Sequence, residues 1–334
     1  MQTSFWEQAA DPFKRLFWWG QISMLRACPP LAGVVANESL GAGHSLKVWV
    51  ITLLRLAARM PRVAAQHVSD KKNKRVVFSR VSFIVTTRCT LNCDKCISRL
   101  YDRKDRSDSP TQELLGDIEK LLAGVDYIYA ILLFGGEPFL HPDLDLVMRA
   151  CAVSEKVGSI NIITNGTLIP DAKTLAALRE TRASVKISNY GPALQPNVEK
   201  LKRVLAANGI AYTHESAAFW RDLGAYGQLK EGASKRRFSI CHQQLCSICH
   251  DGRLHLCAES AMLMDEGIIP DSPEDYINLR TASPAQFREK RRVLLKKRVI
   301  TACSYCLGTT YIAPRIPVAV QREGERKDAS LRET

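Results

Sequence analysis

The sequence lacks a long hydrophobic run. Its longest apolar stretch, Val48–Leu54, ends at Arg55 and is far shorter than the ~20 residues that a membrane-spanning helix needs. The first ten residues contain Glu7 and have neither the basic start nor the apolar core of a secretory signal. These absences exclude an integral membrane protein and predict a cytoplasmic chain that is soluble or bound to a membrane surface.

Acidic residues are scarce at the N-terminal end. The 334 residues carry a net charge of +13, and residues 1–80 hold twelve Lys/Arg against four Asp/Glu, together with four of the five Trp. Basic residues interleaved with Trp and Phe suit the surface of an anionic membrane. We expect residues 1–75 to form a helical extension that contacts a membrane or a partner protein, or that packs as a cap on the rest of the chain.

From residue 76 onward, short apolar segments alternate with helical ones. We expect strands at 76–85, 127–134, 159–164, 184–188 and 211–215, and helices at 110–123 (capped by Ser109), 142–157, 170–181 and 195–208. This alternation predicts an α/β fold with a parallel sheet, either open or barrel-like, over residues 76–235.

The alternation stops near residue 236. Residues 236–317 contain six of the eleven cysteines, a hairpin signal at Asp251-Gly252 and one expected helix at 284–298. We expect them to form a small cysteine-rich module. Residues 318–334 are rich in charge and are expected to be a disordered tail.

Cysteine is the informative residue type, because nine of the eleven cysteines fall in tight groups. In a cytoplasmic chain, close-set cysteines indicate metal ligands rather than disulfides. Cys89, Cys93 and Cys96 follow the first expected strand, and three such thiolates could hold an iron–sulfur cube that leaves one iron open. The alternatives are a zinc site lacking one ligand, or buried free thiols.

Polar and glycine residues follow each of the next three expected strands. The candidate cofactor-binding residues at these strand ends are Gly135, Gly136, Glu137, Asn165, Ser188 and Asn189. Ligands of α/β folds bind beyond the carboxyl ends of the strands, so these residues predict a cofactor pocket that faces the cysteine loop.

On these motifs, residues 76–215 resemble the radical S-adenosylmethionine (radical SAM) superfamily. The resemblance implies a partial (βα)6 barrel and a [4Fe–4S] cluster that is held by the three loop cysteines and chelated by SAM. It also implies that Gly135, Gly136 and Glu137 meet the SAM amino group, and that Ser188 and Asn189 meet its ribose or carboxylate. An electron donor such as flavodoxin or ferredoxin is implied as a partner. The chain departs from the family at Lys95, where an aromatic residue is usual, although the Lys stem could cover the adenine.

The C-terminal cysteines resemble the auxiliary-cluster module called SPASM, or its shortened twitch form. The resemblance implies a second [4Fe–4S] cluster ligated by Cys257, Cys303 and Cys306, with Cys241 or Cys246 as the fourth ligand. Two alternatives use other pairings. Residues 246–250 spell a haem c attachment motif, and a zinc ribbon could pair Cys246/Cys249 with Cys303/Cys306.

The resulting hypothesis is an oxidoreductase-type radical SAM enzyme that abstracts hydrogen from a small-molecule substrate. A similarity to glycan-associated members of the superfamily favours a saccharide or nucleotide-sugar, with a peptide as the alternative substrate. Trp220–Gly224 is expected either to contact the substrate or to pack between modules. A zinc-containing nucleic-acid-binding protein is the rival, but it leaves the cysteine loop without a role, and the positive charge lies elsewhere.

Overall fold

The computed structural model describes residues 70–322, apart from 71, 104, 225–228, 230 and 311. Most of the expected N-terminal extension lies outside the described residues. Within them, no helix has both the length and the apolar character to cross a membrane.

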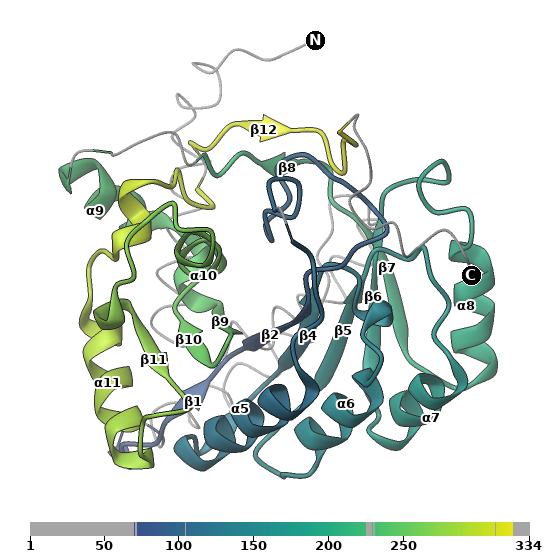
Figure 1. Cartoon of the computed structure of the whole chain (residues 1–334), viewed down its shortest axis with the longest axis horizontal. Coiled ribbons are helices and arrows are strands. Elements are labelled where there is room, and N and C mark those ends of the chain that lie inside the picture. The colour runs from purple at the N-terminus through teal and green to yellow at the C-terminus, as the bar shows by residue number, and fades with distance from the viewer. Residues whose placement is uncertain are drawn as a thin grey trace.

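An eight-stranded sheet with the order β11-β10-β9-β2-β4-β5-β6-β7 organises the molecule (Figure 1). Its strands are β2 (Val81–Thr86), β4 (Ile131–Gly135), β5 (Ile160–Thr164), β6 (Ser184–Asn189), β7 (Tyr212–Ser216), β9 (Ser247–His250), β10 (Arg253–His255) and β11 (Tyr276–Asn278). The pairings from β9 through β2 to β7 are all parallel, whereas β10 and β11 are antiparallel. This arrangement confirms the predicted α/β fold with a parallel-rich, partly closed sheet.

The helices lie outside the curve of the sheet, except for α10 (Figure 1). They are α5 (Thr111–Gly124), α6 (Leu144–Ala152), α7 (Ala172–Glu180), α8 (Val198–Ala207), α9 (Glu231–Ile240), α10 (Ala258–Asp265) and α11 (Pro284–Lys296). Leu114, Ile118 and Leu121 of α5 are buried at helical spacing, which docks this helix on the sheet. The helix α11 begins with a capping box between Ser283 and Gln286.

Two short strand pairings complete the fold. β1 (Val77–Phe78) pairs with β3 (Tyr127–Ile128), and β8 (Trp220–Arg221) pairs with β12 (Arg315–Ile316). The β8–β12 ribbon crosses the open side of the sheet in Figure 1. The first two strands expected from the sequence are each interrupted. Their first parts, β1 and β3, pair with each other in a separate small sheet, and the chain joins the main sheet only at β2 and β4.

The hairpin around Asp251-Gly252 forms as predicted, with both residues at positive φ. Its first strand, β9, then adds a parallel strand beside β2, so the cysteine-rich part continues the core sheet rather than standing beside it. β9 was not expected from the sequence, because a strand of four residues is too short to show an alternation of apolar and polar residues. The helices α9 and α10 were also not expected from the sequence.

Two local expectations need correction. Ser109 does not cap α5, because the first helix turn receives no side-chain hydrogen bond and the Ser109 hydroxyl donates instead to the Ile84 carbonyl (3.0 Å). The segment 318–322, which was expected to be disordered, is ordered and pairs with the cysteine loop: Gln321 forms a bridge with Cys93. Residues 323–334 lie outside the described residues.

Candidate active site

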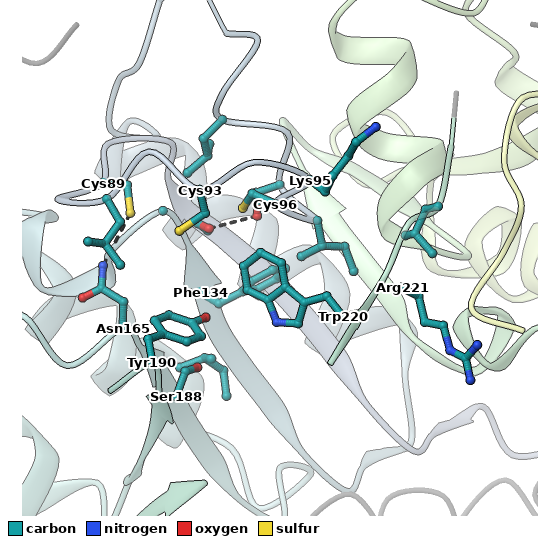
Figure 2. A pocket seen from close by; sticks show the side chains of 18 of the residues that line it. Cys89, Cys93, Lys95, Cys96, Phe134, Asn165, Ser188, Tyr190, Trp220 and Arg221 are labelled. Carbon is teal, nitrogen blue, oxygen red and sulfur yellow. Dashed lines mark hydrogen bonds between the residues drawn. The ribbon is translucent and has the colours of Figure 1, made fainter. Parts of the chain in front are cut away.

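A cavity of about 400 Å³ opens at the carboxyl ends of the parallel strands, where the sequence predicted a cofactor pocket. Its lining includes the three loop cysteines and the predicted residues Gly135, Gly136, Asn165 and Ser188. Figure 2 shows the sulfurs of Cys89, Cys93 and Cys96 along one side of this cavity, with the rings of Tyr190 and Trp220 opposite them. The topology therefore gathers residues from four separate strand ends.

The cysteine loop is held tightly against the end of β4. Gly135 has φ +147°, and a Cβ there would lie 2.1 Å from the Thr86 carbonyl oxygen. At Gly136 a Cβ would lie 1.9 Å from the Arg88 carbonyl oxygen, so only glycine fits at either position. The buried Ser98 hydroxyl adds a hydrogen bond to the Gly135 carbonyl (2.9 Å). These contacts fix the loop relative to the strand.

Glu137 takes a different position from the one expected. Its side chain is fully buried, does not line the cavity, and accepts hydrogen bonds from the Thr164 hydroxyl (2.8 and 2.9 Å) and the Asn165 amide (2.8 Å). Burial raises the pKa of Glu137 to about 7, against the lowering effect of these donors. Its carboxyl group therefore ties the end of β4 to the end of β5.

Asn189 also lies outside the cavity lining, since its side-chain oxygen accepts from the Gly191 amide (3.0 Å) and closes a turn. Asn165 does reach the cysteine loop. Its Nδ2 donates to Thr90 Oγ1 (2.9 Å) and lies 3.5 Å from Cys89 Sγ (Figure 2). Of the strand-end amides, only Asn165 thus contacts the candidate cluster site in the described structure.

Lys95 lines the cavity in a left-handed conformation (φ +56°), and its ammonium lies 3.5 Å from Asp222. Trp220 lines the cavity too and meets Tyr190 edge-on, with ring centroids 5.8 Å apart. The same segment joins the modules, because Gly224 forms a bridge with Cys306. Trp220 therefore lines the cavity while Gly224 joins the modules, and contact of this segment with a substrate stays a prediction.

Several lining residues were not expected from the sequence: Phe134, Tyr190, Phe219, Gln243 and Thr309. Tyr190 could have been found, because it directly follows the strand end that was already singled out. Gln243 and Thr309 come from distant segments that carried no local signal.

The thiols of the loop are desolvated. Burial raises the pKa of Cys93 to about 11 and also raises the pKa values of Cys89 and Cys96. Cluster iron binds cysteine as thiolate, and a bound metal offsets exactly this kind of penalty. Three soft sulfur donors beside a cavity with room for a further ligand fit a [4Fe–4S] cluster with an open iron.

A second, much smaller cavity of about 30 Å³ lies among four other cysteines. Its lining includes Cys241, Cys257, Cys303 and Cys306, together with Glu259 and several apolar side chains. Cys246 lies elsewhere, in contact with the Arg80 guanidinium, and Cys249 is buried in the main core beside Asp117. The structure therefore does not bring together the pairs that a zinc ribbon would need. Among the described residues, no group of three or more His, Cys, Asp or Glu is arranged to hold a single metal ion.

The helix α10 connects the two sites. Cys257 is the residue before its first turn, and Glu266 follows its last. Glu266 pairs with Arg99 (2.9 Å) and Asp265 pairs with Arg103, both just beyond Cys96 in the first cysteine loop. One end of this helix thus lies at the second cavity and the other end anchors the loop of the first.

Comparisons with known proteins agree with this geometry. Residues 83–214 match the family described as "Radical SAM superfamily". Over 107 residues the chain is 30% identical to the GTP 3′,8-cyclase of Chlorobaculum tepidum, covering 30% of this chain and 29% of that protein. Over 128 residues it is 27% identical to the GTP 3′,8-cyclase of Aquifex aeolicus, covering 37% and 38%. The chain therefore spans about a third of the length of these curated relatives.

Two solved structures are also similar. One is BtrN in complex with AdoMet and 2-DOIA, with 16% identity and a TM-score of 0.46 over 70% of this chain and 96% of that one. The other is Streptococcus suis SuiB bound to S-adenosylmethionine, with 19% identity and a TM-score of 0.37 over 53% and 41%. The family match coincides with the strands that carry the cysteine loop and the cavity. Residues 83–214 therefore form a domain of the radical SAM superfamily, whose cofactors are a [4Fe–4S] cluster and S-adenosylmethionine.

Proposed function

We propose that this protein is a radical SAM enzyme in which Cys89, Cys93 and Cys96 hold the [4Fe–4S] cluster. The observation that carries the proposal is the shared cavity, since the three thiols of one loop line the same space as the ends of β4, β5 and β6. Its volume of about 400 Å³ lies within the range of small-molecule sites. The cavity is where SAM and the substrate would meet.

The residues of the chain would bind and orient SAM and the substrate, and would shield the reaction from water. When bound, the reduced cluster and SAM supply a 5′-deoxyadenosyl radical that abstracts hydrogen. Gly135 and Gly136 line the cavity with backbone alone, and Asn165 and Ser188 offer polar groups beside them. The ring of Trp220 covers the other side and would keep water away from a reactive species.

A second cluster in the small cavity is the next part of the proposal. The ligand set that the positions favour is Cys241, Cys257, Cys303 and Cys306, which removes Cys246 from the two candidates for the fourth ligand. Four thiols leave no open iron, so this cluster would transfer electrons rather than bind substrate. Residues 76–235 would then be the radical SAM core and residues 236–317 the auxiliary module, despite their common sheet.

For the substrate, we propose a saccharide or nucleotide-sugar that is oxidised or epimerised at a carbinol carbon. The lining supports a polar small molecule, because Gln243, Thr309 and Arg221 add hydrogen-bonding and cationic groups to the aromatic wall. The matched relatives are named for a nucleotide, GTP.

The test is to incubate reduced, reconstituted protein with SAM and with panels of nucleotide-sugars, free saccharides and peptides. We expect 5′-deoxyadenosine above the uncoupled background only with the sugar panels. Stimulation by peptides alone would replace the saccharide proposal with peptide modification. A complete absence of 5′-deoxyadenosine, in the presence of an intact cluster, would contradict the enzymatic proposal.

Residues 1–75 remain proposed as a contact to a membrane surface or to a partner protein, with a cap on the barrel as the alternative. A flavodoxin or ferredoxin is proposed separately as the electron donor. Co-sedimentation with anionic vesicles tests the membrane contact. Full-length protein should pellet with the vesicles, and a version that starts at Lys71 should stay in solution. Equal pelleting of the two would exclude a membrane role for the extension.

A further inference from the structure

The cysteine loop is covered by a short segment from the far end of the described chain, Ala319–Arg322, which we call the C-terminal clamp. The Asp94 amide donates to the Val320 carbonyl (2.7 Å), and the Arg322 amide donates to the Asn92 carbonyl (2.9 Å). Two backbone hydrogen bonds between segments some 230 residues apart require a defined geometry, and they place the clamp directly beside Cys93.

The Gln321 side chain forms hydrogen bonds with the cysteine loop, including one to the Cys93 sulfur. Its Oε1 accepts from the Asn92 amide (2.9 Å), and its Nε2 donates to Cys93 Sγ (3.1 Å) and to the Ala319 carbonyl (2.7 Å). Because a backbone N–H can only donate, the oxygen of the amide must face Asn92. The nitrogen must then face the sulfur, so the orientation of the amide is fixed by its neighbours.

Arg322 braces the same loop without touching a sulfur. Its guanidinium pairs with Asp94 (2.8 Å) and Asp102 (3.1 Å) and lies over the Tyr101 ring, 4.5 Å from its centroid. The two side chains thus have separable roles. Gln321 contacts a candidate cluster ligand, whereas Arg322 contributes to holding the loop in place.

Hydrogen bonds to cysteine sulfur are among the features that set the reduction potential of an iron–sulfur cluster. A donor draws electron density from the sulfur and thereby favours the reduced, more negative cluster. The corresponding amide contact at Cys89 is longer, 3.5 Å from Asn165 Nδ2, so Gln321 makes the shorter of these two side-chain amide contacts to loop sulfurs.

We propose that Gln321 is a positioning residue that fixes Cys93 and raises the reduction potential of the cluster in the first cavity. The clamp thereby makes the C-terminal segment a part of the radical SAM site. This inference rests on the proposed ligand set of Cys89, Cys93 and Cys96.

The experiment compares Gln321→Met, Gln321→Glu and the control Arg322→Ala in the full-length chain. Gln321→Met removes both the donor and the acceptor at similar volume. Gln321→Glu keeps an acceptor for Asn92 but replaces the donor with a negative charge. The midpoint potential is read from the EPR signal of the reduced cluster during a redox titration, in protein whose auxiliary cysteines Cys241 and Cys257 are replaced by Ala.

At the wild-type midpoint, Gln321→Met should lower the ratio of reduced to oxidised cluster about tenfold, which corresponds to about 59 mV for one electron. Gln321→Glu should lower it further, and Arg322→Ala should leave it unchanged. An unaltered midpoint in both Gln321 variants would overturn the proposal, as would an equal shift in Arg322→Ala, which would indicate general loosening.

Amide hydrogen exchange in the cluster-free protein gives a second readout. The amides of Asn92 and Asp94 should be protected in the wild type and should exchange faster in Gln321→Met and Arg322→Ala, respectively. Unprotected wild-type amides would overturn the clamp itself. Protected amides in a chain that never acquires a cluster would instead retain the clamp and contradict the proposed ligand set.

Discussion

The two cysteine sites differ more in their surroundings than in their ligands. The first has three thiols on one continuous loop beside a cavity of about 400 Å³, and the second has four thiols from separate segments around a cavity of about 30 Å³. Apolar side chains such as Phe238 and Ile300 close the second site. If both sites hold clusters as proposed, the first leaves room beside its cluster for an exchangeable ligand, whereas the second leaves almost none.

The largest expected effect breaks the first site alone. Replacing Cys89, Cys93 and Cys96 together by Ala should abolish 5′-deoxyadenosine formation and reduce iron from about eight to about four per chain, since each [4Fe–4S] cluster holds four. Iron and sulfide analysis of anaerobically reconstituted protein measures this. An unchanged iron content would show that the loop is not a cluster site.

The second site can be broken with a matched pair of variants. Cys241→Ala should lose about four iron atoms per chain. Cys246→Ala should keep all of them, because Cys246 lies against Arg80 rather than in the small cavity. Both should retain the EPR signal of the first cluster. Loss of iron in Cys246→Ala with retention in Cys241→Ala would reverse the assignment of the fourth ligand.

A third prediction concerns the strand ends that shape the first cavity. The folded-state pKa of Glu137, about 7, lies above its ordinary value of 4.5, so the folded state favours the protonated form. The stability from this difference is present below pH 4.5 and is lost as the pH rises to about 7. Cluster-free Glu137→Gln should therefore show a flatter decrease of unfolding free energy between pH 5 and 7 in urea titrations. An identical pH profile for the two proteins would mean that Glu137 is ionised throughout.

The smallest expected effect concerns Lys95, which stands where the family usually has an aromatic residue. If the Lys stem covers a ligand in the cavity, Lys95→Met should change SAM affinity little, because the ion pair with Asp222 is partly exposed and such pairs contribute ~0.2–1 kcal/mol. Lys95→Ala removes the stem and should weaken binding several-fold more, as measured by calorimetry. Equal affinities for the Ala and Met variants would show that the stem covers nothing.

The sequence predicts the first site better than the second for a physical reason. Cys89–Cys96 and the strand ends are local patterns, and parallel strands necessarily bring their carboxyl ends to one edge of a sheet. The choice of Cys241 over Cys246 depends instead on how α9 and the segment at Cys303 pack, and nothing local determines that. The buried hydrogen bonds of Glu137 to Thr164 and Asn165 could not be predicted, because a motif does not reveal which neighbour a buried carboxyl group faces.

The clamp and the strand β9 show the same limit. Both consist of four residues whose partners lie far away in the sequence. The stretch 318–322, Val-Ala-Val-Gln-Arg, is too short to show a strand pattern and leads directly into a charge-rich sequence that is typical of a disordered tail. The tertiary pairing supplies the order that the local sequence lacks.

The position of α10 has a consequence for electron transfer. With clusters in both sites, the helix that begins beside Cys257 and ends at the ion pairs to the first loop would act as a spacer of fixed length. Eight helical residues span ~12 Å. Electron tunnelling falls steeply with distance, so the length of this one helix would limit how fast the two clusters exchange an electron.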